Sequence, residues 1–276
     1  MNVDTLAAAI EPLIVSYGAG VNSTAMLCGF AERGIVPDAI LFADTGGEKP
    51  DTYAFLDVMD KWLTEHGMPN LIRLKYRPTR VGSSVWDSLE QECIVSGSLP
   101  SLAYGWHKCS AKWKVKPQMK WFEEWPVAKQ AADAGVLVKK AIGFRVGEER
   151  RRKDHIQDPG TVKVYPLLEW KWDQDDCRKA IVRAGLPMPP KSSCFFCPAS
   201  TRTDVAKLAL EMPDLFDRAV AMEHAAQKAG NLQTVVGLGR HWTWESVGAA
   251  ARAQCRLPGF DNTDIPCGCY DGDDDD

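Results

Sequence analysis

A run of small residues near the start of the chain is the segment best suited to hold phosphate. Gly18, Gly20 and Ser23 follow an apolar run of strand length and lead into an apolar pattern of helical period. Glycine lets the backbone turn sharply and brings its amides close to an anion. Ser23 and Thr24 stand where a helix begins, and the free N–H groups and dipole of a helix start favour phosphate. The pattern predicts a phosphate-binding turn between a strand and a helix.

Three kinds of phosphate-binding turn share this outline. A Walker loop has a lysine before its Ser or Thr, and this loop has none. A dinucleotide fingerprint needs a third glycine where the chain has Ser23, although Asp44 ends the next apolar run, where a ribose-binding acid lies in that fold. The pyrophosphate loop of the adenine-nucleotide alpha-hydrolases, usually S-G-G-x-D-S, is similar to G-A-G-V-N-S at Gly18 to Ser23. A glycine-rich turn without ligand is the remaining alternative.

Cysteines form a second group of residues with chemical potential, nine in all. Cys194 and Cys197 form a C-x-x-C motif, which can bring two thiolates round a tight turn to one metal. Cys109 and either Cys267 or Cys269 can complete a four-thiolate site, and we take Cys267 as the fourth ligand. A redox dithiol or a set of free thiols are the alternatives.

Basic side chains gather in two runs, which suit a polyanion, although a solvated helix face is the commoner explanation of such a cluster. The runs are Lys108, Lys112, Lys114, Lys116 and Lys120, and Arg145, Arg150, Arg151, Arg152 and Lys153. The net charge of the chain is −4, and an acidic tail over residues 271–276 carries five of its acids. Removing those five charges leaves the rest of the chain at +1, so the basic runs stand on a nearly neutral body.

The composition is that of a globular protein, with 45% apolar and 25% charged residues among 276. No apolar run is long enough to cross a bilayer, and no secretory signal is visible at the N-terminus. We therefore expect a cytoplasmic protein that does not contact membranes.

The elements that must position these residues alternate between strand and helix. Expected strands lie over about 13–17, 39–44, 71–76, 136–143 and 162–168, and expected helices over about 23–33, 51–66, 85–94, 173–184, 204–211, 214–228 and 243–254. This alternation predicts an α/β fold with a parallel twisted sheet flanked by helices, whose ligands gather at the carboxyl ends of the strands. A basic segment that ends at Pro117 interrupts the alternation.

Prolines at 187, 189 and 190 mark a domain boundary. We expect a nucleotide-binding α/β domain over 1–185, a cysteine-containing helical region over 186–270 and a disordered acidic tail over 271–276.

Six segments occur in the order seen in the phosphoadenosine-phosphosulfate-reductase-like proteins. They are Gly18 to Ser23, Phe42 to Gly46, Cys109 with its following lysines, Gly143-Phe144-Arg145-x-x-Glu148-x-x-Arg151, Tyr165 to Trp170, and Cys194-x-x-Cys197-Pro198. The chain resembles most closely the branch with the ATP pyrophosphatases of DNA phosphorothioation, over about residues 10–200. The dinucleotide interpretation explains only the first two segments.

The resemblance implies an adenine-nucleotide alpha-hydrolase (HUP-like) fold and an ATP pyrophosphatase that forms AMP and pyrophosphate with Mg²⁺. The implied nucleotide-binding residues are Ser16, Gly18, Gly20, Asn22, Ser23 and Thr24 at the phosphates and Asp44, Thr45 and Gly46 at the adenosine. Ser23, Arg145 and Arg151 (or Arg152) are the implied catalytic residues. In the relatives, cysteines like Cys109, Cys194 and Cys197 hold a [4Fe–4S] cluster, for which zinc is the alternative here.

The implied function is adenylation of an acceptor for sulfur incorporation, with a cysteine desulfurase as sulfur donor. DNA is favoured as the acceptor and tRNA is the alternative, while the oligomeric state stays open, a homodimer being one candidate. Adenylyl sulfate reduction and a non-catalytic nucleotide-binding module with structural zinc are the other functions to consider. Two features depart from the family pattern: Asn22 replaces the usual loop Asp, and no fourth cysteine adjoins the C-x-x-C. Glu148 or Glu149 either binds Mg²⁺ or pairs with the neighbouring arginines, and we favour pairing.

Overall fold

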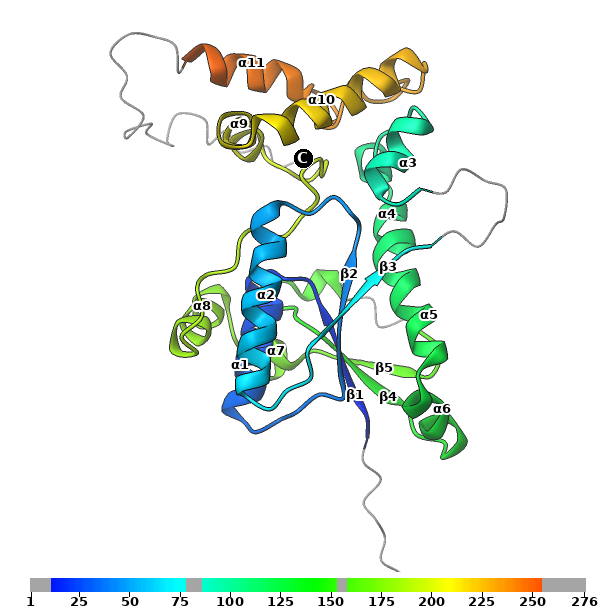
Figure 1. Cartoon of the computed structure of the whole chain (residues 1–276), viewed down its shortest axis with the longest axis vertical. Coiled ribbons are helices and arrows are strands. Elements are labelled where there is room, and N and C mark those ends of the chain that lie inside the picture. Colours follow the sequence, from blue (N-terminus) through cyan, green and yellow to red (C-terminus); the bar gives the residue numbers. More distant parts are fainter. Residues whose placement is uncertain (1–10, 78–85, 153–157, 255–276) are drawn as a thin grey trace, which may run out of the picture.

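The computed structural model describes residues 11–77, 86–152 and 158–254, and one parallel sheet organises them (Figure 1). Its five strands follow the order β3-β2-β1-β4-β5. They are β1 (Leu13–Tyr17), β2 (Ala39–Asp44), β3 (Leu71–Lys75), β4 (Val138–Ile142) and β5 (Thr161–Val164). The predicted α/β class with a parallel sheet is confirmed.

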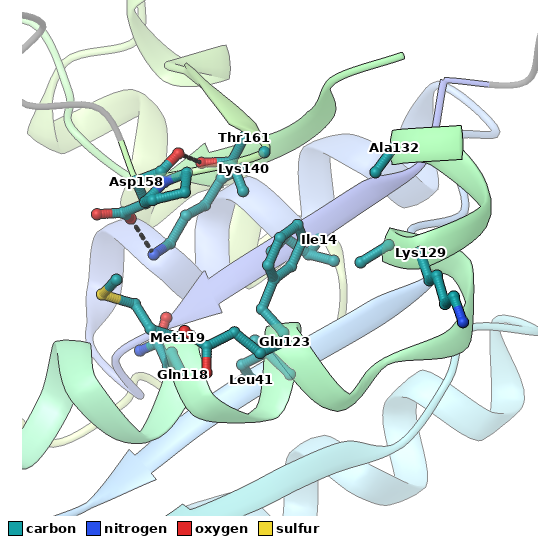
Figure 2. A pocket seen from close by; sticks show the side chains of 14 residues that line it. Ile14, Leu41, Gln118, Met119, Glu123, Lys129, Ala132, Lys140, Asp158 and Thr161 are labelled. Atoms are coloured by element: carbon teal, nitrogen blue, oxygen red, sulfur yellow. Dashed lines mark hydrogen bonds and ion pairs between the residues drawn. The ribbon is translucent and has the colours of Figure 1, made fainter. Parts of the chain in front are cut away.

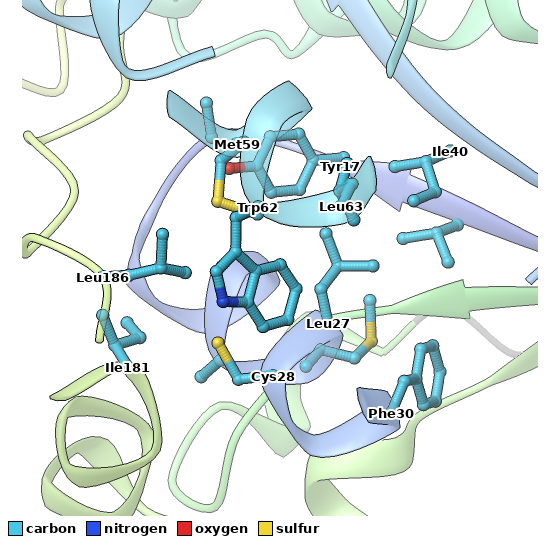
Figure 3. Packing of buried hydrophobic residues seen from close by; sticks show 14 of the residues in the cluster. Tyr17, Leu27, Cys28, Phe30, Ile40, Met59, Trp62, Leu63, Ile181 and Leu186 are labelled. Atoms are coloured by element: carbon cyan, nitrogen blue, oxygen red, sulfur yellow. The ribbon is translucent and has the colours of Figure 1, made fainter. Parts of the chain in front are cut away.

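Helices cover both faces of the sheet, which explains the near-continuous apolar character of its central strands. On one face, Val15 and Ile40 pack into a core shared with α1 (Val21–Glu32), α2 (Pro50–Glu65) and α8 (Gln174–Arg183). Figure 3 shows this core, in which Trp62 of α2 lies beside Cys28 of α1. On the other face, Ile14 and its neighbours pack against α5 (Lys116–Glu124) and α6 (Pro126–Asp133).

The order of the strands places a switch of direction between β1 and β4. From β1 the chain proceeds outward through β2 to β3, then returns to add β4 and β5 on the other side of β1. The loops that follow β1 and β4 therefore diverge above the same edge of the sheet, where open parallel sheets bind ligands. The predicted phosphate turn follows β1 and the arginine segment follows β4, so the fold brings the two together.

The helix boundaries agree with the sequence pattern within a few residues. The amphipathic segment after Trp172 begins with the predicted N-cap, because the Asp173 carboxylate accepts the amides of Asp175 and Asp176. The fifth strand is shorter than expected and ends at Val164, since Pro166 opens the short helix α7 (Pro166–Glu169).

The basic segment that ends at Pro117 is helical, which the sequence pattern did not predict. The chain is helical from Lys108 to Glu124, through α4 (Lys108–Ser110), a π-helical turn η2 (Ala111–Val115) and α5. Pro117 stands in the first turn of α5, directly after the wide π turn. A proline is tolerated where its missing N–H needs no helical acceptor, and π turns inside helices are frequent at functional sites.

A second hydrophobic core lies beyond the carboxyl edge of the sheet. It joins α3 (Leu89–Val95), η1 (Ser101–Tyr104), α9 (Arg202–Glu211), α10 (Pro213–Lys228) and α11 (Trp244–Gln254) to the C-x-x-C segment. Residues from before and after the proline-rich stretch at 187–190 thus share one core.

Some of the sequence predictions concern residues outside the described part of the chain. These are residues 255–276, with the predicted tail and Cys267 and Cys269, and Lys153 of the second basic run. None of the helices described is long and apolar enough to span a membrane.

Glu223 holds the second core together. Its buried carboxylate accepts the backbone N–H of Leu238 at 2.7 Å and that of Trp244, where α11 begins, at 3.0 Å. We expect Glu223→Ala to lower the free energy of unfolding by about 2–4 kcal/mol in urea titrations, because it leaves buried amides without acceptors. Glu245→Ala, which removes only an exposed partner of His224, is the control, with a loss below about 1 kcal/mol. Equal effects of the two substitutions would contradict this assignment.

Candidate functional site

The predicted phosphate turn, between β1 and α1, leads into an uncapped helix start, a feature that favours anions. Gly20 precedes α1, no side chain caps the helix, and its first turn carries no acid. The amides of Val21, Asn22 and Ser23 therefore have no acceptor within the helix and mark its positive end. Ser23 braces the turn, since its hydroxyl accepts the Gly18 N–H at 3.3 Å and donates to the Gly20 carbonyl at 3.2 Å.

The left-handed residue of this turn is Ala19 and not a glycine. Its φ is 56° and its side chain is fully buried. Residues with a Cβ rarely adopt this conformation, which costs about 1–2 kcal/mol. At Gly18 and Gly20, by contrast, an added Cβ would meet no atom closer than 3.9 Å. The strain at Ala19 is maintained by the surrounding packing.

Two predicted nucleotide ligands turn away from the loop. The Ser16 hydroxyl donates to Gln118 of α5 at 3.0 Å. Thr24 is fully buried and its hydroxyl pairs with that of Tyr17 at 3.1 Å. Both hydroxyls are thus engaged within the fold, that of Ser16 by α5 and that of Thr24 by β1.

The loop after β4 forms the second wall of the site. Gly143 lies so close to α1 that a Cβ would be 3.1 Å from the backbone nitrogen of Ser23. Asn22 donates its amide to Glu148 at 2.7 Å, and Arg151 pairs with the same carboxylate at 2.6 Å. The pairing of Glu148 with an arginine that the sequence favoured is confirmed. Arg145 turns its guanidinium toward Gln174 of α8, 3.3 Å away.

The turn after β2 forms the third wall. Asp44 is buried and accepts the Gly46 N–H at 2.7 Å and the Tyr53 hydroxyl at 2.8 Å. Burial and this carboxylate raise the pKa of Tyr53 well above its ordinary value. Gly46 has a φ of +71°, and a Cβ there would collide with Ser88 at 2.6 Å. Asp44 thus fixes the turn, with Lys75 at 3.5 Å as a further partner.

The same turn is joined to the C-x-x-C segment. Thr45 Oγ1 lies 3.1 Å from Cys194 Sγ, and the Phe195 N–H donates to the Gly47 carbonyl at 2.8 Å. Glu48 and Cys194 form an isolated antiparallel bridge. A Cβ on Gly47 would meet the Phe196 ring at 2.6 Å, so the two segments are in close contact. The candidate adenosine turn and the candidate metal-binding motif are therefore one packed unit.

Three cysteines that the sequence linked lie in one neighbourhood. Cys194 is buried in the second core, and Cys109 and Cys197 pack against it. Burial raises the pKa of Cys194 to about 12 and also raises the pKa of Cys197. Without a metal these two thiols are therefore protonated at neutral pH, which makes them weak nucleophiles.

Two further residues lie in this neighbourhood that no sequence pattern had linked to the C-x-x-C motif. Cys93 of α3 is buried in the same core, and Cys109 and Cys194 are close enough to contribute, after burial itself, to the rise of its pKa. Glu48 is also buried, with one oxygen 3.3 Å from Lys114 Nζ and the other without a hydrogen-bond partner. Desolvation alone would lower the pKa of Lys114, but Glu48 and then Cys194 outweigh it and raise that pKa.

The donors suit a zinc or iron–sulfur centre in type, but their arrangement does not form a coordination sphere. Across residues 11–77, 86–152 and 158–254, no three Cys, His, Asp or Glu side chains are placed to hold a metal ion. Cys267, the predicted fourth ligand, lies outside these residues. The second Glu48 oxygen is buried without a hydrogen-bond partner, so it could accept a cation or a hydrogen-bond donor.

Two cavities lie away from the phosphate turn. One, of about 360 Å³, lies between the sheet and α5 and α6, where Lys140 pairs with Asp158 at 2.8 Å (Figure 2). The other, of about 160 Å³, is lined by Cys93 and Cys109 together with Lys108 and other residues.

Ser192 is another residue of the site that the sequence did not reveal. Its hydroxyl donates to the Gly18 carbonyl and so ties the segment before Cys194 to the phosphate turn.

No protein-family model matches this sequence, and a search of curated proteins found no significant match.

The contact between Gly143 and α1 can be tested by adding one methyl group. We expect Gly143→Ala to destabilise the protein by about 1–3 kcal/mol, measured by urea unfolding, because the Cβ would press on helix backbone that cannot move aside. Gly18→Ala is the matched control, since its Cβ meets nothing closer than 3.9 Å. A Gly143→Ala protein as stable as the control would show that the two loops do not meet as described.

Proposed function

We propose that the chain is an ATP pyrophosphatase that adenylates an acceptor so that sulfur can be incorporated. The observation that carries the proposal is the uncapped start of α1 at the switch point of the sheet, faced by the arginine-bearing loop after β4. An uncapped helix start in this position favours the triphosphate of a nucleotide. The resemblance to the DNA phosphorothioation ATP pyrophosphatases selects ATP among the nucleotides.

The residues divide the work along the triphosphate. The amides of Val21 to Ser23 face the β,γ-phosphates, and the Asp44 to Gly46 turn receives the adenosine. Arg151, whose side chain is 61% exposed, and Arg145 supply positive charge at the α-phosphate. An acceptor oxygen attacks the α-phosphorus in line, the bond to pyrophosphate breaks, and the developing charge is stabilised by these cations. A sulfur nucleophile then displaces AMP, which leaves with the former acceptor oxygen.

Mg²⁺ fits the site as a partner of the nucleotide. The carboxylates of Glu148 and Asp44, which lie near the phosphate turn, are already engaged, the first by Asn22 and Arg151 and the second by Gly46 and Tyr53. Mg²⁺ binds readily through substrate phosphates and water and needs few protein ligands. It would enter on the triphosphate and neutralise charge there.

The thiol neighbourhood supports the sulfur half of the proposal. Thr45 joins the adenosine turn to Cys194, so sulfur chemistry can take place next to the activated acceptor. Cys109, Cys194 and Cys197 remain the proposed ligands of a [4Fe–4S] cluster, with zinc as the alternative and Cys267 as the proposed fourth ligand. The sulfur is proposed to be supplied by a cysteine desulfurase.

DNA is the proposed acceptor, with tRNA as the alternative. Lys108, Lys112 and Lys116 lie on the continuous helical segment that begins at Lys108 in α4 and passes through η2 into α5. Lys108 lies 5.7 Å from the ring of Trp106, an indole that is 62% exposed. Exposed aromatic rings with cations beside them suit nucleic acid, whose bases stack and whose phosphates attract lysine.

The activity is tested by following conversion of ATP to AMP and pyrophosphate, with duplex DNA and a cysteine desulfurase present. We expect AMP formation that falls about 100-fold in Ser23→Ala, because the side chain that braces the phosphate turn is lost. Ser246→Ala, on the exposed start of α11, should leave the rate unchanged. Failure of the unaltered protein to form AMP under these conditions, or release of sulfite from adenylyl sulfate without ATP, would overturn the proposal.

The cofactor is tested separately by anaerobic purification with analysis of iron, sulfide and zinc. We expect about four irons per chain, lost in Cys194→Ala because this substitution removes one of the proposed thiolate ligands. Cys28→Ala is the control, since Cys28 is buried in the other core. Stoichiometric zinc would overturn the cluster and leave the nucleotide proposal standing.

A further inference from the structure

One carboxylate connects the phosphate turn to the arginine loop. Glu148 Oε2 accepts the side-chain amide of Asn22 at 2.7 Å and the backbone N–H of Arg145 at 3.3 Å. Its other oxygen, Oε1, accepts from Arg151 Nη1 at 2.6 Å. The carboxylate is 17% exposed, whereas the Arg151 side chain is 61% exposed. Glu148 is thus held by Asn22 and the Arg145 backbone, while its partner Arg151 is exposed to solvent.

This connection explains why the chain has Asn and not Asp at position 22. An aspartate there would place a second carboxylate where the Asn22 amide now lies 2.7 Å from Glu148. Two carboxylates at that distance cannot both ionise, and one of them holds a proton with a raised pKa. The amide of Asn22 removes this conflict and donates the hydrogen bond that the two loops share.

We propose that Glu148 is a positioning residue that fixes the arginine loop against the phosphate turn and holds Arg151 ready for the triphosphate. This inference rests on the proposed function. When the nucleotide binds, Arg151 exchanges its partner on Glu148 for phosphate oxygen, while Asn22 and the Arg145 amide keep Glu148 in place. The second contact of Arg151, its guanidinium 4.7 Å from the Phe144 ring, keeps it above the site during the exchange.

No neighbouring group named below makes the link that Glu148 makes between the phosphate turn and the arginine loop. The guanidinium of Arg145 is held by the Val146 carbonyl at 2.9 Å and by Gln174. From α8, the Cys177 thiol faces this region, and its pKa is raised to about 12, first by burial, so it is neutral near pH 7. Glu149, one residue on, is exposed and accepts the Gly147 N–H at 3.0 Å. Of these groups, Glu148 is the one that contacts both loops.

The test exchanges the two partners. The variants are Asn22→Asp, Glu148→Gln and the double variant, with Glu149→Gln as the control for loss of a neighbouring negative charge. Binding of the Mg²⁺ complex of α,β-methylene ATP is measured by calorimetry between about pH 5.5 and 8.5, so that affinity is read without turnover and across the range in which a coupled carboxylate pair titrates. Urea unfolding of the same proteins without nucleotide gives the coupling free energy between positions 22 and 148.

At about pH 8, Asn22→Asp should weaken binding about 10–100-fold, because the two carboxylates repel across the joined loops. The affinity of this variant should recover as the pH falls toward about 5.5, because one acid then takes up a proton and a hydrogen bond forms again. Glu148→Gln should weaken binding only about 3–10-fold, since its carbonyl still accepts from Asn22 while the charge facing Arg151 is lost.

The double variant should bind within about threefold of Glu148→Gln, since the carboxylate introduced at position 22 can accept from the new amide at position 148. Glu149→Gln should stay within about twofold of the unaltered chain. If the unaltered chain binds the analogue and Asn22→Asp binds equally well at every pH, this inference is wrong and the proposed function stands. A double variant no better than Asn22→Asp also overturns it. No binding by the unaltered chain overturns the proposed function, and the urea coupling then reports on the Asn22–Glu148 contact alone.

Discussion

The approach of Gly143 to the first turn of α1 is the contact on which the candidate site depends. A Cβ added to Gly143, the residue that follows β4, would lie 3.1 Å from the backbone nitrogen of Ser23. Only glycine therefore fits without strain at this position. Because the two strands are neighbours at the switch point, this contact sets the distance between the phosphate turn and the arginine loop. This closeness allows the hydrogen bond from Asn22 to Glu148 to form, and Glu148 in turn pairs with Arg151.

A second contact places the cysteines of the C-x-x-C segment at the same carboxyl edge of the sheet. The turn after β2 contacts the C-x-x-C segment through Thr45, Gly47 and Glu48, while Ser192 reaches back to the loop after β1. The candidate nucleotide turns and the thiols thus belong to one packed assembly, although Thr45 and Cys194 are 149 positions apart in the chain. A reaction that activates an acceptor with ATP and then delivers sulfur needs this proximity, since the activated intermediate must meet the sulfur before it meets water.

Local patterns in the sequence were enough for the sheet, most helices and the glycine-containing turn between β1 and α1. The Gly18 to Ser23 segment and the Asp173 cap depend on neighbours in the chain, so the residue types alone predict them. Pairings across the fold left no such signal: Glu48 with Lys114, Cys93 beside Cys109, and Ser16 turned to Gln118. The helix through Pro117 was missed because a π turn, not a break, accommodates that proline. Ala19 was missed because packing, not residue preference, holds its left-handed backbone.

The central claim is that the phosphates of ATP are held by the amides at the start of α1. A crystal structure with the Mg²⁺ complex of α,β-methylene ATP tests this most directly. We expect the β,γ-phosphates against the amides of Val21, Asn22 and Ser23, the adenine near the Asp44 to Gly46 turn, and Arg151 released from Glu148 toward phosphate. A nucleotide bound in the cavity between the sheet and α5 and α6, or an anion-free turn beside a bound nucleotide, would contradict it.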